Sequence, residues 1–173
     1  FIMHNRGKKS LCIDVKTPEG QAVIKDLITV SDVLFENFTP GIMAHYGLTY
    51  DLVAQINPRI IMCSVSTYGQ TGPYSRRIGN DLVALAAGGV LHMMGEPDGY
   101  PAYPGSAIGD HMGALNAFGS ICPALFHRER TGEGQHIDLA LVDCAYNAHD
   151  WALAAYSITN GEVDPQRGGT QRT

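Results

Sequence analysis

Asp143 is the residue of this sequence whose type and position best suit covalent chemistry. It lies in the stretch 135–150, where the apolar alternation of a strand changes to helical spacing near Leu141. A carboxylate in the first turn of a helix faces exposed amides and the helix dipole, which favour its ionised form. An ionised, positioned carboxylate can attack an activated acyl group and carry it as a covalent intermediate. The alternative is that Asp143 only begins a helix, as most acids at such positions do.

Two polar residues, Asn147 and Asp150, follow Asp143 by four and seven positions and share its helical face. They either orient a substrate or form a solvated face. Cys144 and His149 also lie in this stretch, but a spacing of five turns them to different sides of a helix. A thiol–imidazole pair is therefore not expected.

Two further stretches allow both a functional and a structural interpretation. The glycines of GQTGP, residues 69–73, either let the backbone approach a ligand or form a surface turn, and the sequence has no GxGxxG or phosphate-loop pattern. Asp110 is either an acid or base, or the cap of the helix that follows it. The seven histidines lack HExxH or related ligand spacing, so we expect no metal site.

The elements that position these residues alternate between strands and helices, which indicates an α/β layer with a mostly parallel sheet. Strands are expected over residues 10–15, 32–36, 60–65 and 136–141. The continuously apolar run 60–65 suits a strand that is buried on both faces. Helices are expected after a Thr17 cap, over 42–46, 49–55, 81–94 with a close approach or break at Gly88-Gly89, 110–130, and from the strand-to-helix switch to about Ile158.

The ends of these strands should bring the candidate residues together. Ligands on parallel sheets usually meet the loops at the carboxyl ends of the strands. Asn37 and Phe38, the loop 68–73, and Asp143 each follow an expected strand. We therefore expect these groups to line one crevice.

The composition is that of a folded protein and restricts its partners. The 173 residues, 45% hydrophobic and 17% charged, fit one domain or part of a larger one. A net charge of −5 argues against general nucleic-acid binding, and no apolar run is long enough to span a membrane. Four separated cysteines without a CxxC pair fit reduced, buried thiols in a cytoplasmic protein. Because the chain opens at Phe1 and ends in the polar run 166–173, we expect part of a longer protein.

Seven stretches of the chain together resemble the class III CoA-transferase family, also called the CaiB/BaiF family. They occur in the family's order over nearly the whole chain, and the combination of ENFxPG with GQTGP is specific. The stretches are NRGKKSLCIDVKTPEG (5–20), DVLFENFTPG (32–41), NPRII (57–61), YGQTGPY (68–74), GND (79–81), RTGEGQHIDLALVD (130–143) and RGG (167–169).

The resemblance implies a fold and an assembly. Residues 1–160 would form part of a Rossmann-like large domain, a mostly parallel sheet flanked by helices, and residues 161–173 would lead as a linker toward a second domain. Family members are about twice this length and form homodimers interlocked like chain links. The chain lacks the family's first strands and second domain, so it is expected to be inactive alone. The family's RxGN pattern becomes Arg167-Gly168-Gly169-Thr170, a departure at the hinge.

The resemblance also implies a reaction. Family members move coenzyme A, bound as an acyl-CoA substrate, to a small carboxylic acid through an aspartyl anhydride and an aspartyl-CoA thioester, without a metal. Asp143 occupies the position of the catalytic aspartate.

The resemblance further implies where CoA binds. Asn37 and Phe38 match a loop that holds the nucleotide end of CoA, and Ser66, Thr67 and Tyr68 match the segment near its pantetheine. His45 is also assigned to CoA binding, although it stands where many members have an arginine that contacts a CoA phosphate and so departs from the family's pattern.

Two alternatives remain beside the transferase. A 2-methylacyl-CoA racemase shares the fold but uses a histidine in a GHD motif, where this chain has Gly79-Asn80-Asp81, and Asn80 cannot act as that base. Asp110 matches the racemase acid but occurs in transferases too. The other alternative is a CoA-binding fragment without chemistry, which the missing first strands motivate.

Overall fold

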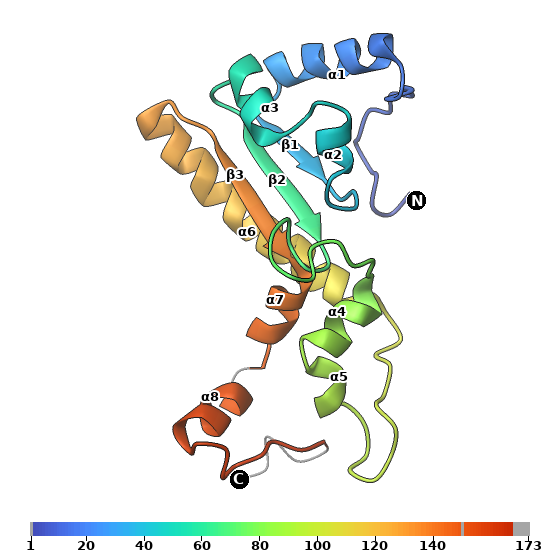
Figure 1. The fold of residues 1–173 in the computed structure, drawn as a ribbon, viewed down its shortest axis with the longest axis vertical. Coiled ribbons are helices and arrows are strands. Elements are labelled where there is room, and N and C mark those ends of the chain that lie inside the picture. The colour runs from blue at the N-terminus through green and yellow to red at the C-terminus, as the bar shows by residue number, and fades with distance from the viewer. Residues whose placement is uncertain (1, 150, 168–173) are drawn as a thin grey trace.

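A parallel three-stranded sheet forms the centre of the structure, a computed structural model that describes residues 2–149 and 151–167 (Figure 1). The strands β1 (Val33–Glu36), β2 (Ile61–Ser66) and β3 (Gln135–Ala140) lie in the order β1-β2-β3. Cys63 of β2 pairs with Phe35 on one side and with Ile137 on the other. Every residue of β2 is buried, as its continuous apolar run predicted. The expected parallel α/β sheet is confirmed.

Helices cover both faces of this sheet. Helices α1 (Pro18–Val30), α2 (Ile42–His45) and α3 (Tyr50–Ile56) pack with Leu34 of β1 on one face. The long helix α6 (Ile108–Thr131) packs through Ala117 against Cys63 and Leu139 on the other face. Leu34 and Cys63 belong to opposite faces because Leu34 pairs with Met62, and successive strand side chains alternate.

The remaining helices lie beyond the carboxyl ends of β2 and β3 (Figure 1). The glycine pair Gly88-Gly89 separates helices α4 (Asp81–Ala87) and α5 (Val90–Met93), and Gly89 has a φ of 83°. Of the two expected alternatives at this pair, a close approach or a break, the structure shows a break. Helix α7 (Leu141–Asn147) continues directly from β3, and α8 (Trp151–Ile158) follows it. Within the described residues, no helix is long and apolar enough to cross a membrane.

Local sequence signals explain several element ends. The Thr17 side chain accepts a hydrogen bond from the Gly20 amide at 3.1 Å and caps α1, with Pro18 at its first position. Gly132, with a φ of 82°, ends α6 in the left-handed region that glycine adopts easily. A Cβ on Gly113 would collide with the Leu141 side chain, so the glycine lets α6 approach α7 closely.

Two expected elements differ in the structure. The strand expected over residues 10–15 does not form, and this exposed segment folds instead onto the start of α1, where the Thr17 amide bonds to the Asp14 carbonyl at 3.2 Å. A strand needs a ladder partner, and none of the described strands lies beside it. The single helix expected to run to Ile158 is instead two helices, α7 and α8, and the His149 ring that follows α7 lies 2.6 Å from the Gly88 carbonyl oxygen.

Arg128 ties the amino ends of two strands together. Its side chain is only 8% exposed, and its guanidinium lies 2.9 Å from the Asp32 carboxylate and 3.4 Å from the carbonyl oxygens of Asp32 and Arg59. Asp32 directly precedes β1, and Arg59 precedes β2. Arg128 thus holds the C-terminal end of α6 at the amino ends of β1 and β2. The candidate residues lie at the opposite, carboxyl ends of these strands.

Candidate active site

Asp143 stands at the third position of α7, and its carboxylate is not used to cap that helix. The N-cap is Ala140, which offers no side-chain bond. Asp143 is exposed, and its carboxylate has neither a hydrogen bond nor an ion pair with any residue in the described part of the chain. Asp143 lies in the first turn of α7, the position that both interpretations of this residue require, and its carboxylate is left available for an external group.

Asp143 lines a hollow of about 210 Å³, the aspartate hollow, together with Asn147 and with Ser120 of α6. Its remaining lining residues are Asn116, Ile137, Asp138, Leu139, Ala140 and Cys144. Asn147 thus faces the same space as Asp143, as their spacing predicted, whereas Asp150 lies outside the described residues.

The Cys144 thiol is not a competing nucleophile at this place. Cys144 is buried, and burial first, then the neighbouring Asp143 carboxylate, raises the pKa of its thiol. Its spatial relation to His149 also argues against a pair, because the His149 ring is engaged by the Gly88 carbonyl.

A second hollow of about 120 Å³, the ENF hollow, lies at the carboxyl ends of β1 and β2. It gathers five of the six residues that the resemblance assigned to CoA: Asn37, Phe38, Ser66, Thr67 and Tyr68. Its other lining residues are Thr39, Pro40, Ser75, Arg77, Ile78 and Gly79.

Two partly buried hydrogen bonds hold the walls of the ENF hollow. The Asn37 amide donates to the Val65 carbonyl at 2.7 Å, and the Glu36 carboxylate accepts from the Phe38 amide at 2.8 Å. Ser66 is only 5% exposed, yet its hydroxyl has no hydrogen-bond partner among the described residues. Because buried polar groups are nearly always bonded, this hydroxyl is suited to a ligand.

His45, the sixth residue assigned to CoA, is not among the residues that line the ENF hollow. It lies on α2, exposed, with its ring edge-on to Tyr46 at 5.0 Å between centroids. The structure therefore separates His45 from the other five candidates.

The expected single crevice is wrong, because Asp143 and the ENF residues line two separate hollows. A direct backbone contact nevertheless connects them. The Val142 amide, next to Asp143, donates to the carbonyl of Thr67 at 3.0 Å, and Thr67 lines the ENF hollow. The first turn of α7 is thus held in a fixed relation to the end of β2, which strand-order reasoning alone could not provide.

Asp138 is a site residue that sequence reasoning missed. Both of its carboxylate oxygens accept the Gln70 amide at 3.0 Å, which anchors the GQTGP loop to β3. Gly69 and Gly72 have φ values of 81° and 88°, so the glycines of this loop serve its turns. The alternation of side chains along β3 was the available signal for Asp138, because it places Asp138 and Ala140 on the same face of the sheet.

Asp110 does not cap α6. The N-cap is Ala107, and the Asp110 amide instead donates to the Asp81 carboxylate of α4 at 3.0 Å. Burial first, and then the charge of Asp81, raises the pKa of Asp110. Asn80, at the position of the racemase base, caps α4 by accepting from the Val83 amide at 3.0 Å.

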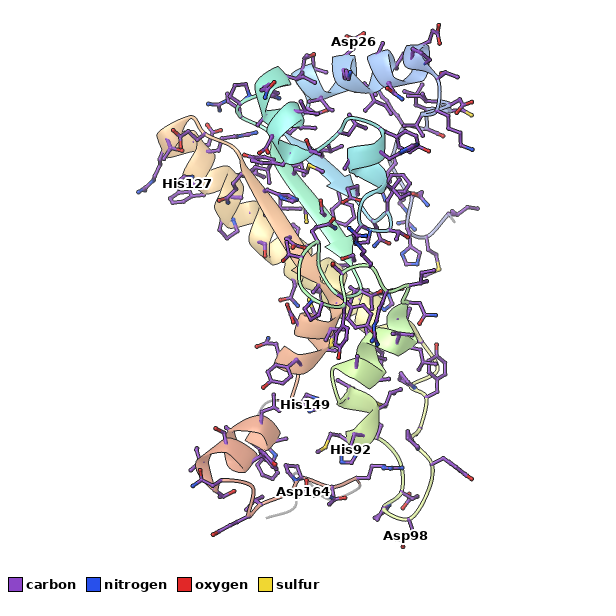
Figure 2. All side chains as sticks on the ribbon, in the orientation of Figure 1. Asp26, His92, Asp98, His127, His149 and Asp164 are labelled. Atoms are coloured by element: carbon purple, nitrogen blue, oxygen red, sulfur yellow. The ribbon has the colours of Figure 1, made fainter. Side chains whose placement is uncertain are left out.

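A further hollow of about 300 Å³ opens between α5 and α8. Figure 2 labels His92, His149 and Asp164 around it, while His127 and Asp26 lie in the opposite part of the molecule.

In the described part of the chain, no three His, Cys, Asp or Glu side chains come together as a metal site would require.

Comparison with known proteins agrees with this arrangement. The family model described as CoA-transferase family III matches residues 1–173. The beta subunit of succinyl-CoA–L-malate CoA-transferase from Chloroflexus aurantiacus is 43% identical over 159 residues, which cover 91% of this chain and 39% of that protein. Succinyl-CoA:glutarate CoA-transferase from Mus musculus is 40% identical over 170 residues, covering 98% of this chain and 38% of that protein.

A solved structure gives the same result. The crystal structure of a CaiB/BaiF family protein from Brucella suis superposes with a TM-score of 0.89 at 39% identity, over 94% of this chain and 43% of that chain. The chain spans about two fifths of the length of the curated relatives that it matches. The profile match over all 173 residues, together with this structural likeness, means that the chain belongs to CoA-transferase family III.

Proposed function

We propose that the intact protein is a CoA-transferase that moves CoA from an acyl-CoA thioester to a small carboxylic acid, with Asp143 as the nucleophile. One observation carries the proposal: the Asp143 carboxylate is exposed and unengaged within the described chain, while the adjacent Val142 amide bonds to Thr67 of the ENF hollow at 3.0 Å. A CoA held in the ENF hollow would therefore have a nucleophile at a fixed position beside it.

The proposed reaction begins when a carboxylate oxygen of Asp143 attacks the thioester carbonyl. The carbon–sulfur bond breaks, CoA leaves as the thiolate, and the acyl group stays on Asp143 as a mixed anhydride. The thiolate then attacks the aspartyl carbonyl, which releases the donor acid as a carboxylate and leaves an aspartyl-CoA thioester. The acceptor carboxylate attacks the aspartyl carbonyl of this thioester, which expels the CoA thiolate and forms a second mixed anhydride. The thiolate then attacks the acceptor-derived carbonyl of that anhydride, which forms the new acyl-CoA and releases the Asp143 carboxylate.

The substrate class is proposed from the relatives. Two of them are named as transferases that use succinyl-CoA, with L-malate or glutarate as the partner acid. We infer a dicarboxylic acyl-CoA as donor and a small dicarboxylic acid as acceptor. The ENF hollow is proposed to hold part of CoA through Asn37, Phe38 and the segment 66–68, and its unpartnered Ser66 hydroxyl supports this. His45 is not proposed as a CoA contact.

We also propose, from the resemblance, that the intact protein is a cytoplasmic homodimer of interlocked chains. Residues 1–160 would belong to its large domain, and residues 161–173 would lead to the second domain. Cross-linking and size measurements on the intact protein test the dimer.

Trapping of the acyl-enzyme tests the nucleophile. When the intact protein turns over succinyl-CoA in the presence of hydroxylamine, the hydroxamate should form on Asp143 alone. The Asp143→Ala variant should keep CoA binding and lose both trapping and transfer. Asp110→Asn is the matched control, because Asp110 lines neither hollow, and it should keep both. Transfer by Asp143→Ala, or a hydroxamate on another residue, would refute the assignment.

The same variants test the racemase alternative. A racemase would exchange the α proton of a 2-methylacyl-CoA with solvent deuterium, and Asp110→Asn would stop that exchange. We expect no exchange in the wild type, because Asn80 is engaged as the cap of α4.

A further inference from the structure

The aspartate hollow presents neutral polar side chains beside the Asp143 carboxylate. Asn147 of α7 and Asn116 and Ser120 of α6 line it together with Asp143. Asn116 donates one hydrogen of its side-chain amide to the Met112 carbonyl at 2.9 Å and keeps a second one. Neither the Ser120 hydroxyl nor the Asn147 side-chain amide has a hydrogen bond to another described residue. Donors for an external acceptor atom are therefore available on both helices that border the hollow.

The negative charge of this hollow decreases during the proposed reaction. Asp138 and Asp143 are its charged lining residues, and within the described chain no lysine or arginine lines it. Both carboxylate oxygens of Asp138 accept the Gln70 amide at 3.0 Å. Asp143 has lost its charge when the acceptor acid reacts, because it then carries CoA as a thioester. An anionic acceptor therefore meets the least repulsion at the step in which it reacts.

Neutral donors suit this place better than a cation would. A lysine or arginine in the hollow would pair with the free Asp143 carboxylate and stabilise its ionised form, which would make it a weaker nucleophile. Amide and hydroxyl donors bind a carboxylate through charge-assisted hydrogen bonds and carry no charge that would hold Asp143. The hollow is thus suited to bind the carboxylate of a second molecule while Asp143 stays free to react.

The spacing of Asp143 and Asn147 limits the length of that molecule. Asn147 follows Asp143 by four residues in α7, so their Cβ atoms lie about 5–6 Å apart. A chain of a few carbon–carbon bonds, each about 1.5 Å long, spans such a distance. The hollow of about 210 Å³ is also smaller than the roughly 300–1,000 Å³ of sites for drug-sized ligands. These dimensions favour a short acid with a second carboxylate a few carbons from the first.

We propose that Asn147, Ser120 and Asn116 form a subsite that binds the far carboxylate of the acceptor acid. They are specificity-determining residues, because they favour a short dicarboxylic acceptor over a monocarboxylic acid of the same length. This inference rests on the proposed function, since it takes Asp143 as the group that carries CoA.

Steady-state kinetics of the intact protein with saturating succinyl-CoA tests the subsite, with glutarate and pentanoate as acceptors. Pentanoate has the same carbon chain length, with a methyl group in place of one carboxylate. Asn147→Ala should raise the KM for glutarate about tenfold, the loss expected for one hydrogen bond to a charged group, and leave the KM for pentanoate within about twofold. Asn147→Asp keeps the shape and adds a negative charge, so it should raise the KM for glutarate further than Asn147→Ala does.

A serine pair provides the matched control. Ser120→Ala should raise the KM for glutarate about three- to tenfold. Ser157→Ala, on α8, should leave it unchanged, because Ser157 does not line the hollow. In the Asn147 and Ser120 variants kcat at saturating glutarate should stay within about threefold, because these residues bind the acceptor and do not react.

The outcomes separate this inference from the proposed function. Equal effects of Asn147→Ala on glutarate and pentanoate would overturn the subsite, and so would a lower KM for glutarate in Asn147→Asp than in Asn147→Ala. A wild-type protein that uses pentanoate as well as glutarate would also overturn it, while transfer through Asp143 would stand. Transfer that persists in Asp143→Ala would overturn the proposed function and this inference with it.

Discussion

Replacement of Arg128 by methionine separates what its charge contributes from what its buried stem contributes. Methionine keeps an apolar stem at the end of α6 and removes the guanidinium. The lost contacts are the ion pairs with the Asp32 carboxylate at 2.9 Å and with the exposed Glu129 carboxylate at 3.5 Å, and the contacts with the carbonyl oxygens of Asp32 and Arg59, both at 3.4 Å. The Asp32 carbonyl still accepts a hydrogen bond from the Ile61 amide at 3.1 Å. The Arg59 carbonyl is not compensated by that donor when the guanidinium is removed.

The expected cost follows from these contacts. The Asp32 carboxylate is 77% exposed, so solvent replaces the ion pair and this part costs about 0–1 kcal/mol. The Arg59 carbonyl, left without this donor, adds a cost of about 1–2 kcal/mol. Removal of the guanidinium also removes a destabilising group, the buried Arg128 Nε, which has no hydrogen-bond partner among the described residues. We expect Arg128→Met to lower the free energy of unfolding by about 1–2 kcal/mol.

Urea denaturation of the intact protein measures this value, with Asp32→Asn as the comparison. The Asp32 variant loses only the exposed ion pair and should cost less than about 1 kcal/mol. The double variant should match Arg128→Met to within about 0.5 kcal/mol, because one partner is already gone. A loss above about 4 kcal/mol in Arg128→Met alone would contradict the reasoning, since it would mean that Asp32 is not effectively solvated.

Two other predictions concern the site and the core. Asp138→Ala removes the acceptor of the Gln70 backbone amide and should lower kcat about tenfold with little change in the KM for CoA. Asp138→Asn keeps one acceptor oxygen and should restore much of kcat. Equal losses of kcat in both variants would indicate a general folding defect. Burial first, then the Glu36 charge, raises the pKa of the Cys63 thiol to about 11, so the folded protein holds this proton more tightly than the unfolded chain. The resulting stability is present below the ordinary thiol pKa and is lost as the pH rises through 11. Unfolding free energies of wild type and Cys63→Ala should therefore converge between pH 9 and 11, and a constant difference would count against the shift.

Elements with local signals could be predicted from the sequence. The Thr17-Pro18 start of α1 and the apolar run of β2 need no distant partner to be recognised, and both are found as expected. The segment 10–15 has the composition of a strand but no neighbouring strand in the described chain, and composition cannot supply one. The division into α7 and α8 has no proline or glycine signal in the sequence, and the contact of His149 with the Gly88 carbonyl joins residues that are distant in sequence.

In the candidate site too, residues with a local sequence signal could be predicted, whereas those that depend on contacts distant in sequence could not. The position at strand ends predicted that Asn37, Phe38 and Tyr68 lie close together, whereas Ser66 and Thr67 were added by the resemblance alone; all five line the ENF hollow. The separation of Asp143 from them, and the Asp138 anchor of the GQTGP loop, depend on how β3 is set against β2. Arg77 has no strand or helix pattern of its own, and only the stack on Tyr74 places it at the hollow.

The position of Arg128 has a consequence for how this protein can be altered. It fastens the amino ends of β1 and β2, whereas the groups that are proposed to meet CoA follow the carboxyl ends of the same strands. Loops at one end of a sheet can vary while the opposite end keeps the scaffold together. Substitutions in the loops at the carboxyl ends can therefore change the proposed binding site while the Arg128 contacts at the amino ends stay unchanged.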